Sequence, residues 1–146
     1  MTGVPTPPVR AGVDQAGLVF RARVYAAGPV WGTGRSAGYV LGTYGSLSPV
    51  LALRWLRGEA LLLADRLDPD PRHCPYLTPG LRPSPAPVAG CADRLRAWAG
   101  DTVGLRTTRA GLKDGRAVSV VFEDEDCAYT LSAWPEHPHQ ARQTAA

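Results

Sequence analysis

The chain has 146 residues, the length of one ordinary domain, and its hydrophobic content of 45% is typical of a globular protein with a sizeable core. Its net charge of +3 falls short of a dedicated basic patch for nucleic acid, and no apolar run reaches the roughly 18–20 residues of a membrane span. The N-terminus lacks the pattern of a signal peptide, and the cysteines are odd in number, so we expect a cytoplasmic protein with reduced thiols.

The first third of the chain predicts a flexible arm followed by a β-hairpin. Residues 1–16 are rich in proline and glycine and show no periodicity, which is typical of a loose arm. Residues 18–26 alternate between apolar and polar and predict a strand. Residues 39–44 predict a second, glycine-weakened strand that pairs with the first, and residues 28–38 are expected to form the connecting loop.

The longest apolar run, residues 49–67, predicts a helix. Ser48 is a suitable N-cap, Pro49 fits the first helical position, and Pro69 disfavours helix at the residue before it. An alternative is a pair of strands hinged at residues 57–59. The length of the run and its wealth of Leu and Ala favour the helix.

Two apolar stripes lie on nearly opposite sides of this helix. The stripe expected to face the core comprises Leu53, Leu56, Ala60, Leu63 and Leu67. The second stripe comprises Leu51, Trp55, Gly58 and Leu62. Burying one Leu or Trp contributes roughly 1.5–3 kcal/mol, so a cover for the second stripe is expected. That cover is either this chain's own later segments or another chain, which Gly58 would allow to approach closely.

The remaining chain completes a predicted α+β domain over residues 17–134. Residues 68–87 hold seven prolines and predict a semi-rigid surface connection, and residues 135–146 predict a disordered tail. Two shorter helices are expected at 88–99 and 102–113, and a second hairpin at 117–122 and 127–134. We expect two β-hairpins in one antiparallel sheet, with one long and one or two shorter helices packed on it.

No pattern predicts a catalytic residue, a metal site or a cofactor. The glycine-rich residues 32–38 precede a strand and not a helix, which argues against a phosphate loop. Cys74, Cys91 and Cys127 lack the close pairing of zinc ligands and any activating motif, and whether one of them is functional stays open. The acidic residues 123–126 are interpreted as a solvated turn.

The leading hypothesis is a non-enzymatic binding or adaptor protein. Its contact with a partner protein, or with a second copy in a homodimer, would be formed by Leu51, Trp55, Gly58 and Leu62. The alternative is a nucleic-acid-associated accessory or regulatory protein that uses an arginine-rich face, composed of Arg21, Arg23, Tyr25, Arg35, Arg54 and Arg57. Because fifteen of the sixteen basic residues are arginine, arginine by itself is a weak sign of function. An enzyme with an unrecognised site is the third hypothesis.

Overall fold

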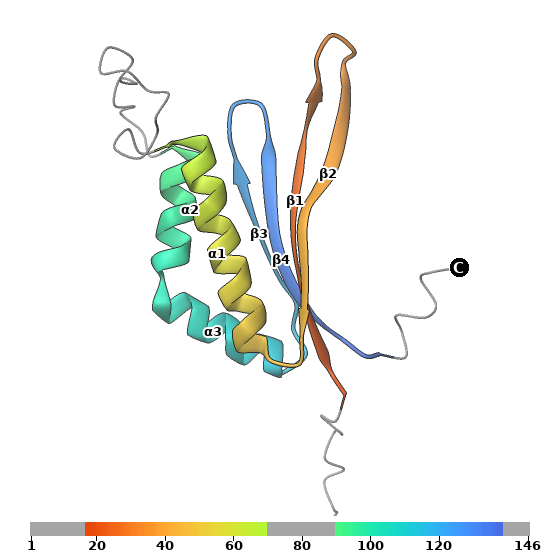
Figure 1. The fold of residues 1–146 in the computed structure, drawn as a ribbon, viewed down its shortest axis with the longest axis vertical. Coiled ribbons are helices and arrows are strands. Elements are labelled where there is room, and N and C mark those ends of the chain that lie inside the picture. Colours follow the sequence, from red (N-terminus) through yellow and green to blue (C-terminus); the bar gives the residue numbers. More distant parts are fainter. Residues whose placement is uncertain (1–16, 70–89, 139–146) are drawn as a thin grey trace, which may run out of the picture.

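A computed structural model describes residues 17–69 and 90–138, which form a four-stranded antiparallel sheet with three helices packed on one face (Figure 1). The strands are β1 (Val19–Val30), β2 (Arg35–Ser46), β3 (Val118–Glu123) and β4 (Ala128–Glu136). The helices are α1 (Pro49–Leu67), α2 (Cys91–Gly100) and α3 (Thr102–Lys113). The predicted α+β fold, with two hairpins in one antiparallel sheet, is confirmed.

The first and last strands lie side by side at the centre of the sheet, whose order is β2-β1-β4-β3. Val24 of β1 pairs with Leu131 of β4, so the two hairpins join into one continuous sheet. This arrangement leaves β2 and β3 at the two edges. Since β2 has 12 residues and β3 has 6, β2 is the longer edge.

The long helix is a single, uninterrupted element, and the alternative of two hinged strands is wrong. Its N-cap is Ser48, whose side chain accepts a hydrogen bond from the backbone N–H of Leu51 at 3.5 Å. At the other end, the Asp68 N–H donates to the Ala64 carbonyl at 2.9 Å. Gly58 therefore lies inside the helix, where it costs roughly 1 kcal/mol relative to alanine.

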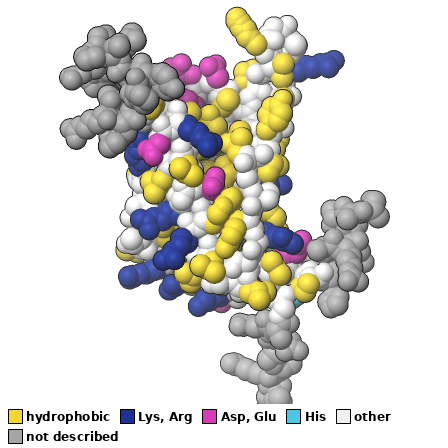
Figure 2. Space-filling model, in the orientation of Figure 1, with side chains coloured by type: hydrophobic (Ala, Val, Ile, Leu, Met, Phe, Trp, Pro, Cys, Tyr) yellow, Lys and Arg dark blue, Asp and Glu magenta, His cyan; other side chains and the backbone are white. Residues whose placement is uncertain are grey.

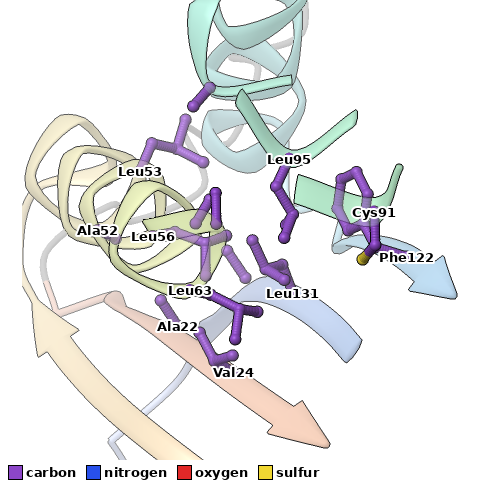
Figure 3. Close-up of a cluster of buried hydrophobic side chains, with 14 of the residues drawn as sticks. Ala22, Val24, Ala52, Leu53, Leu56, Leu63, Cys91, Leu95, Phe122 and Leu131 are labelled. Atoms are coloured by element: carbon purple, nitrogen blue, oxygen red, sulfur yellow. The ribbon is translucent and has the colours of Figure 1, made fainter. Parts of the chain in front are cut away.

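The core lies between the sheet and the helical layer (Figure 3). The stripe predicted to face the core does so, because Leu53, Leu56, Ala60 and Leu63 are buried and Leu67 packs against them. The sheet contributes the alternating β1 residues Phe20, Ala22 and Val24, together with Leu131, Ala133 and Phe122. The shorter helices contribute Cys91, Ala92, Leu95, Ala99 and Leu112.

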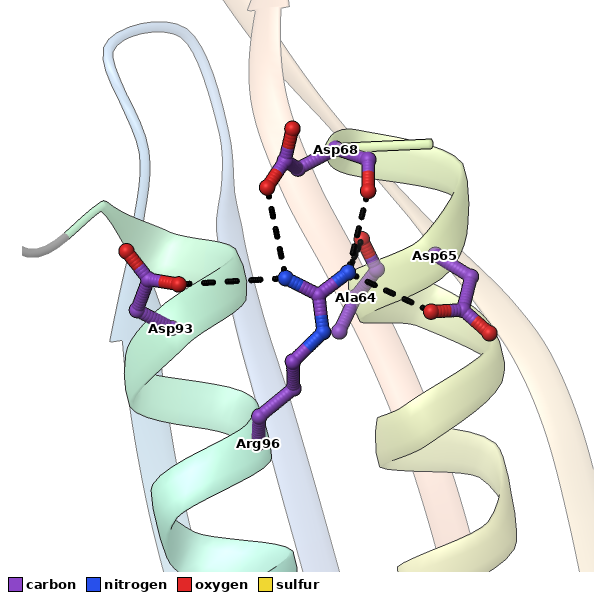
Figure 4. Close-up of polar contacts among 5 residues, drawn as sticks. All are labelled: Ala64, Asp65, Asp68, Asp93 and Arg96. Carbon is purple, nitrogen blue, oxygen red and sulfur yellow. Dashed lines mark hydrogen bonds and ion pairs between the residues drawn. The ribbon is translucent and has the colours of Figure 1, made fainter. Parts of the chain in front are cut away.

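Arg96 of α2 ties that helix to the last turn of α1 (Figure 4). Its guanidinium donates to the backbone carbonyl of Asp68 at 2.9 Å and lies 3.2 Å from the Asp65 carboxylate and 3.3 Å from the Asp68 carboxylate. The last carbonyls of a helix carry partial negative charge, so a cation is favourable there. Arg96 thus caps α1 from a neighbouring helix.

The first hairpin is longer than its sequence indicates, and the expected loop over residues 28–38 is wrong. β1 continues to Val30 and β2 starts at Arg35, so a short turn connects them. Gly32 and Gly34 have φ angles of 76° and 64°, which a tight turn demands and other residues rarely adopt. The predicted arm (1–16), most of the proline-rich connection with Cys74, and the end of the predicted tail lie outside the described residues.

Candidate functional site

The sheet covers Trp55 in the second apolar stripe of α1 and leaves Leu51, Gly58 and Leu62 exposed. The Trp55 indole stacks on the Tyr44 ring of β2, with ring centroids 5.6 Å apart and planes inclined by 11°. Leu51 and Leu62 are 43% and 52% exposed, and a Cβ atom on Gly58 would meet nothing within 4 Å. Among the described residues, the cover at Trp55 comes from β2, which precedes the helix, and neither from the later segments nor from the other chain that the sequence suggested; Leu51 and Leu62 stay accessible.

Strand β2 presents an unpaired edge beside these leucines. In the part of the chain that the structure describes, no strand pairs with the side of β2 that faces away from β1. Its middle exposes Tyr39, Val40 and Leu41. Lysine, proline and β-bulges commonly hinder the pairing of an edge strand with another chain; β2 contains no lysine or proline, although it does contain a bulge. Hydrophobic side chains follow the seam between α1 and β2 in Figure 2. We call the edge residues Tyr39, Val40 and Leu41, together with Leu51 and Leu62 of α1, the α1–β2 surface. Tyr39 lies on the side of the sheet that carries the helices, and Val40, which pairs with Tyr25, lies on the other side.

A β-bulge lies at the middle of this edge. Val24 of β1 pairs with Gly42, and the next residue, Tyr25, pairs with Val40, so Leu41 has no partner on β1. A bulge adds one residue to one strand and reverses the faces that its two halves present. Tyr39 and Gly42 therefore point to the same side of the sheet, the side that carries the helices.

The three glycines of β2 each make room for a side chain from a neighbouring element. A Cβ atom on Gly42 would lie 3.2 Å from the Trp55 indole, and one on Gly45 would lie 2.8 Å from the Arg21 guanidinium. A Cβ atom on Gly38 would overlap the Tyr25 hydroxyl. In the sequence the glycines suggest a weakened strand, but in the structure they are the positions where large side chains of neighbouring elements cross it.

The other face of the sheet has no helix over it in the described ranges 17–69 and 90–138, and it carries Arg21, Arg23 and Tyr25. The Arg21 guanidinium forms a salt bridge of 2.7 Å with Glu136, which neutralises much of its charge. The Arg23 guanidinium lies 5.8 Å from the centroid of the Tyr25 ring and 5.6 Å from that of Trp134. Within the described part of the chain, the face is therefore a small aromatic platform on which Arg23 forms no salt bridge.

The six residues of the nucleic-acid hypothesis do not form one surface. Arg21, Arg23 and Tyr25 lie on the open sheet face, and Arg35 begins β2 at the tip of the hairpin. Arg54 and Arg57 lie on α1, where they line an open hollow of about 220 Å³ between α1 and α3. The α3 residues Arg106 and Arg109 line the same hollow. Sequence reasoning missed this pair. Arg106 and Arg109 are three residues apart, as are Arg54 and Arg57, and this shared spacing was the signal in the sequence. The sequence alone does not indicate, however, that the two helices adjoin.

The environment of Cys91 does not favour nucleophilic activation. Cys91 is buried, and this burial raises the pKa of its thiol, which disfavours the reactive thiolate. Burial, followed by the neighbouring Cys127, raises the pKa of Tyr129 to about 12. Among the described residues no group of three or more histidine, cysteine or acidic side chains is placed to hold a metal ion.

None of the described helices is long and apolar enough to cross a membrane. Comparison with known proteins gives no assignment: no family model, curated protein sequence or solved structure matches this chain.

Proposed function

We propose that the protein is a small, cytoplasmic, non-enzymatic binding protein that works through the α1–β2 surface, and that the chain it binds there is a second copy of itself. The observation that carries this proposal is the unpaired edge of β2, which exposes Tyr39, Val40 and Leu41 beside the accessible Leu51 and Leu62 of α1. An added strand would satisfy the free backbone groups of the edge and cover the leucines.

The bulge makes β2 complementary to a copy of itself. In a regular strand, residues three apart point to opposite faces, but the bulge at Leu41 places Tyr39 and Gly42 on the same face. In an antiparallel copy centred between Val40 and Leu41, each Tyr39 therefore lies opposite Gly42 of the other copy.

This pairing also places apolar groups next to the exposed helix face. Gly42 is in contact with Trp55, so the Tyr39 ring of a second copy would extend the stack formed by Tyr44 and Trp55. The same register sets Ala37 opposite Tyr44, again on the side that carries the helices. A two-fold contact of this kind is isologous and closes at a dimer.

Native mass tests the proposal directly. Sedimentation velocity over a range of concentrations is expected to show a dimer for the natural chain. Val40→Lys and Leu41→Lys place a charge on the edge and are expected to yield monomers with an unchanged fold, because both side chains are exposed. The matched control is Val103→Lys, an apolar and still more exposed position on α3 that is expected to leave the dimer intact. A natural chain that is monomeric at every concentration refutes self-pairing.

Nucleic-acid binding receives less support from the geometry. Its strongest observation is Arg23, which lies over the rings of Tyr25 and Trp134 on the open sheet face. Aromatic and arginine side chains on such a face can stack bases. The neighbouring Arg21 is occupied by Glu136, however, so among the described residues of this face Arg23 is left as the cation that can attract a phosphate backbone.

A further inference from the structure

The hollow between α1 and α3 is lined by the same arrangement of residues from each helix. The contributing positions on α1 are Val50, Leu53, Arg54 and Arg57, and those on α3 are Thr102, Leu105, Arg106 and Arg109. Both sets follow the spacing i, i+3, i+4, i+7, which is one face of a helix. Each helix therefore directs one leucine and two arginines into the hollow, and Figure 2 shows basic side chains gathered over this part of the helical layer.

The four arginines have no compensating acid in the lining. Within residues 17–69 and 90–138, no carboxylate lies within 4.0 Å of the guanidinium of Arg54, Arg57, Arg106 or Arg109. The nearby Asp101 instead accepts the backbone N–H of Gly104 at 2.9 Å as the N-cap of α3. Like charges at this density repel one another and lower the stability of the folded chain. The cluster therefore favours a state in which an anion lies among the arginines.

We propose that this hollow binds a compact polyanion of the diphosphate or triphosphate class. Guanidinium groups form paired, planar hydrogen bonds to phosphate oxygens, which is the geometry that arginine supplies and lysine does not. Four such groups from two neighbouring helices line one hollow, and a short phosphate chain concentrates its charge in a comparably small volume. A nucleic-acid backbone spreads its charge along a line, which a single hollow fits less well.

The floor of the hollow strengthens this interaction. Leu53 is buried and Leu105 half-buried beneath the arginines, so an anion there is partly screened from water by apolar groups. Ionic hydrogen bonds are stronger where the local dielectric constant is low. The volume of about 220 Å³ is below the roughly 300–1,000 Å³ of typical small-molecule pockets, which suits the phosphate chain of a ligand better than the whole of a large one.

Calorimetric titration of the full chain with inorganic pyrophosphate tests the proposal. Arg57→Gln and Arg106→Gln, which come from different helices and are both exposed, are each expected to weaken binding about tenfold, equivalent to ~1.4 kcal/mol. Arg35→Gln, which removes the same charge at the tip of the hairpin, is the matched control and is expected to change binding less than twofold. Equal losses in all three variants would indicate nonspecific attraction and overturn the proposal, as would the absence of pyrophosphate binding.

Two further ligands test which kind of polyanion the hollow prefers. Adenosine triphosphate and a single-stranded DNA oligonucleotide are titrated under the same conditions. Tighter binding of the triphosphate supports the proposal, whereas tighter binding of the oligonucleotide replaces it with a nucleic-acid site.

Thermal unfolding without ligand separates a role in binding from a role in the fold. The variants Arg57→Gln and Arg106→Gln are expected to be at least as stable as the natural chain, because each substitution reduces the repulsion among the arginines. A clear loss of stability would assign these arginines to the fold and refute the site.

Discussion

The stacking of Trp55 on Tyr44 connects the long helix to the outermost strand of the sheet. Their ring centroids are 5.6 Å apart, and Gly42 lies beneath the indole without a side chain that would displace it. Trp55 therefore supports the fold, although the sequence groups it with the residues of a partner surface. Leu51, Gly58 and Leu62 are the members of that stripe that another chain can reach.

Substitution of Trp55 is accordingly expected to affect folding before it affects binding. Trp55→Ala removes the stack and leaves a gap against β2, so we expect a loss of about 2–3 kcal/mol in the free energy of unfolding. Leu62→Ala, on an exposed position of the same helix, is expected to cost less than about 1 kcal/mol. Urea unfolding of both variants measures the difference. Equal losses would show that Trp55 is not packed against β2.

The sequence predicted the elements whose signals are local. The helix from Pro49 to Leu67 has a capping serine, a suitably placed proline and a core-facing stripe, and each of these depends on residues close in sequence. The limits of the first hairpin were not predicted, because Gly38 suggests a loop until Tyr25 is seen to lie across it. Such contacts are tertiary and leave no mark on the strand's own sequence.

The candidate surfaces were likewise predictable only where they depend on residues close together in the sequence. The exposed leucines follow from helical periodicity, since the angular spacing of Leu51 and Leu62 already separates them from the core stripe. The arginine hollow does not follow, because Arg54 and Arg57 become part of a site only when α3 brings Arg106 and Arg109 to them. The edge position of β2 likewise depends on the pairing of β1 with β4.

Arg96 is expected to stabilise the joint between α1 and α2. Arg96→Ala removes the hydrogen bonds to the Asp68 carbonyl and carboxylate, and we expect a loss of about 1–2 kcal/mol, measured by urea unfolding. The matched control is Arg66→Ala, an exposed arginine in the last turn of α1, with an expected change of about 0.5 kcal/mol or less. If Arg96→Ala left the free energy of unfolding unchanged, the capping role would be contradicted.

The raised pKa of Tyr129 predicts a loss of stability in alkaline solution. Burial and the nearby Cys127 raise this pKa from 10.0 to about 12, whereas an unfolded tyrosine ionises near pH 10. Between these values the unfolded chain releases a proton that the folded chain retains, so unfolding becomes more favourable as the pH rises. The contribution is complete below pH 10 and is lost by about pH 12.

Tyr129→Phe isolates this contribution from other alkaline effects. The difference in unfolding free energy between the natural chain and Tyr129→Phe is expected to be constant below about pH 9 and to shift in favour of the variant between pH 10 and about 12. Guanidinium chloride unfolding in a series of alkaline buffers provides the measurement. A difference that stays constant over the whole range would show that Tyr129 ionises alike in both states.

Substitutions of two glycines by alanine are expected to change the stability of the chain in opposite directions. Gly38→Ala places a methyl group on the Tyr25 hydroxyl, so it is expected to destabilise the chain by about 1–3 kcal/mol. Gly58→Ala meets no neighbour within 4 Å and raises helix propensity, so it is expected to stabilise the chain by roughly 1 kcal/mol. Thermal unfolding of the two variants tests the opposite signs.

Gly58→Ala also reports on how closely a second copy approaches α1. Gly58 lies on the exposed stripe between Trp55 and Leu62, and if the other copy covers that stripe at backbone distance, the added methyl group separates the two surfaces. We then expect a more stable monomer together with a dimer that dissociates at higher concentration in sedimentation velocity. An equally stable dimer would show that β2 alone forms the contact, because the strand pairing about Val40 and Leu41 does not involve this position of the helix.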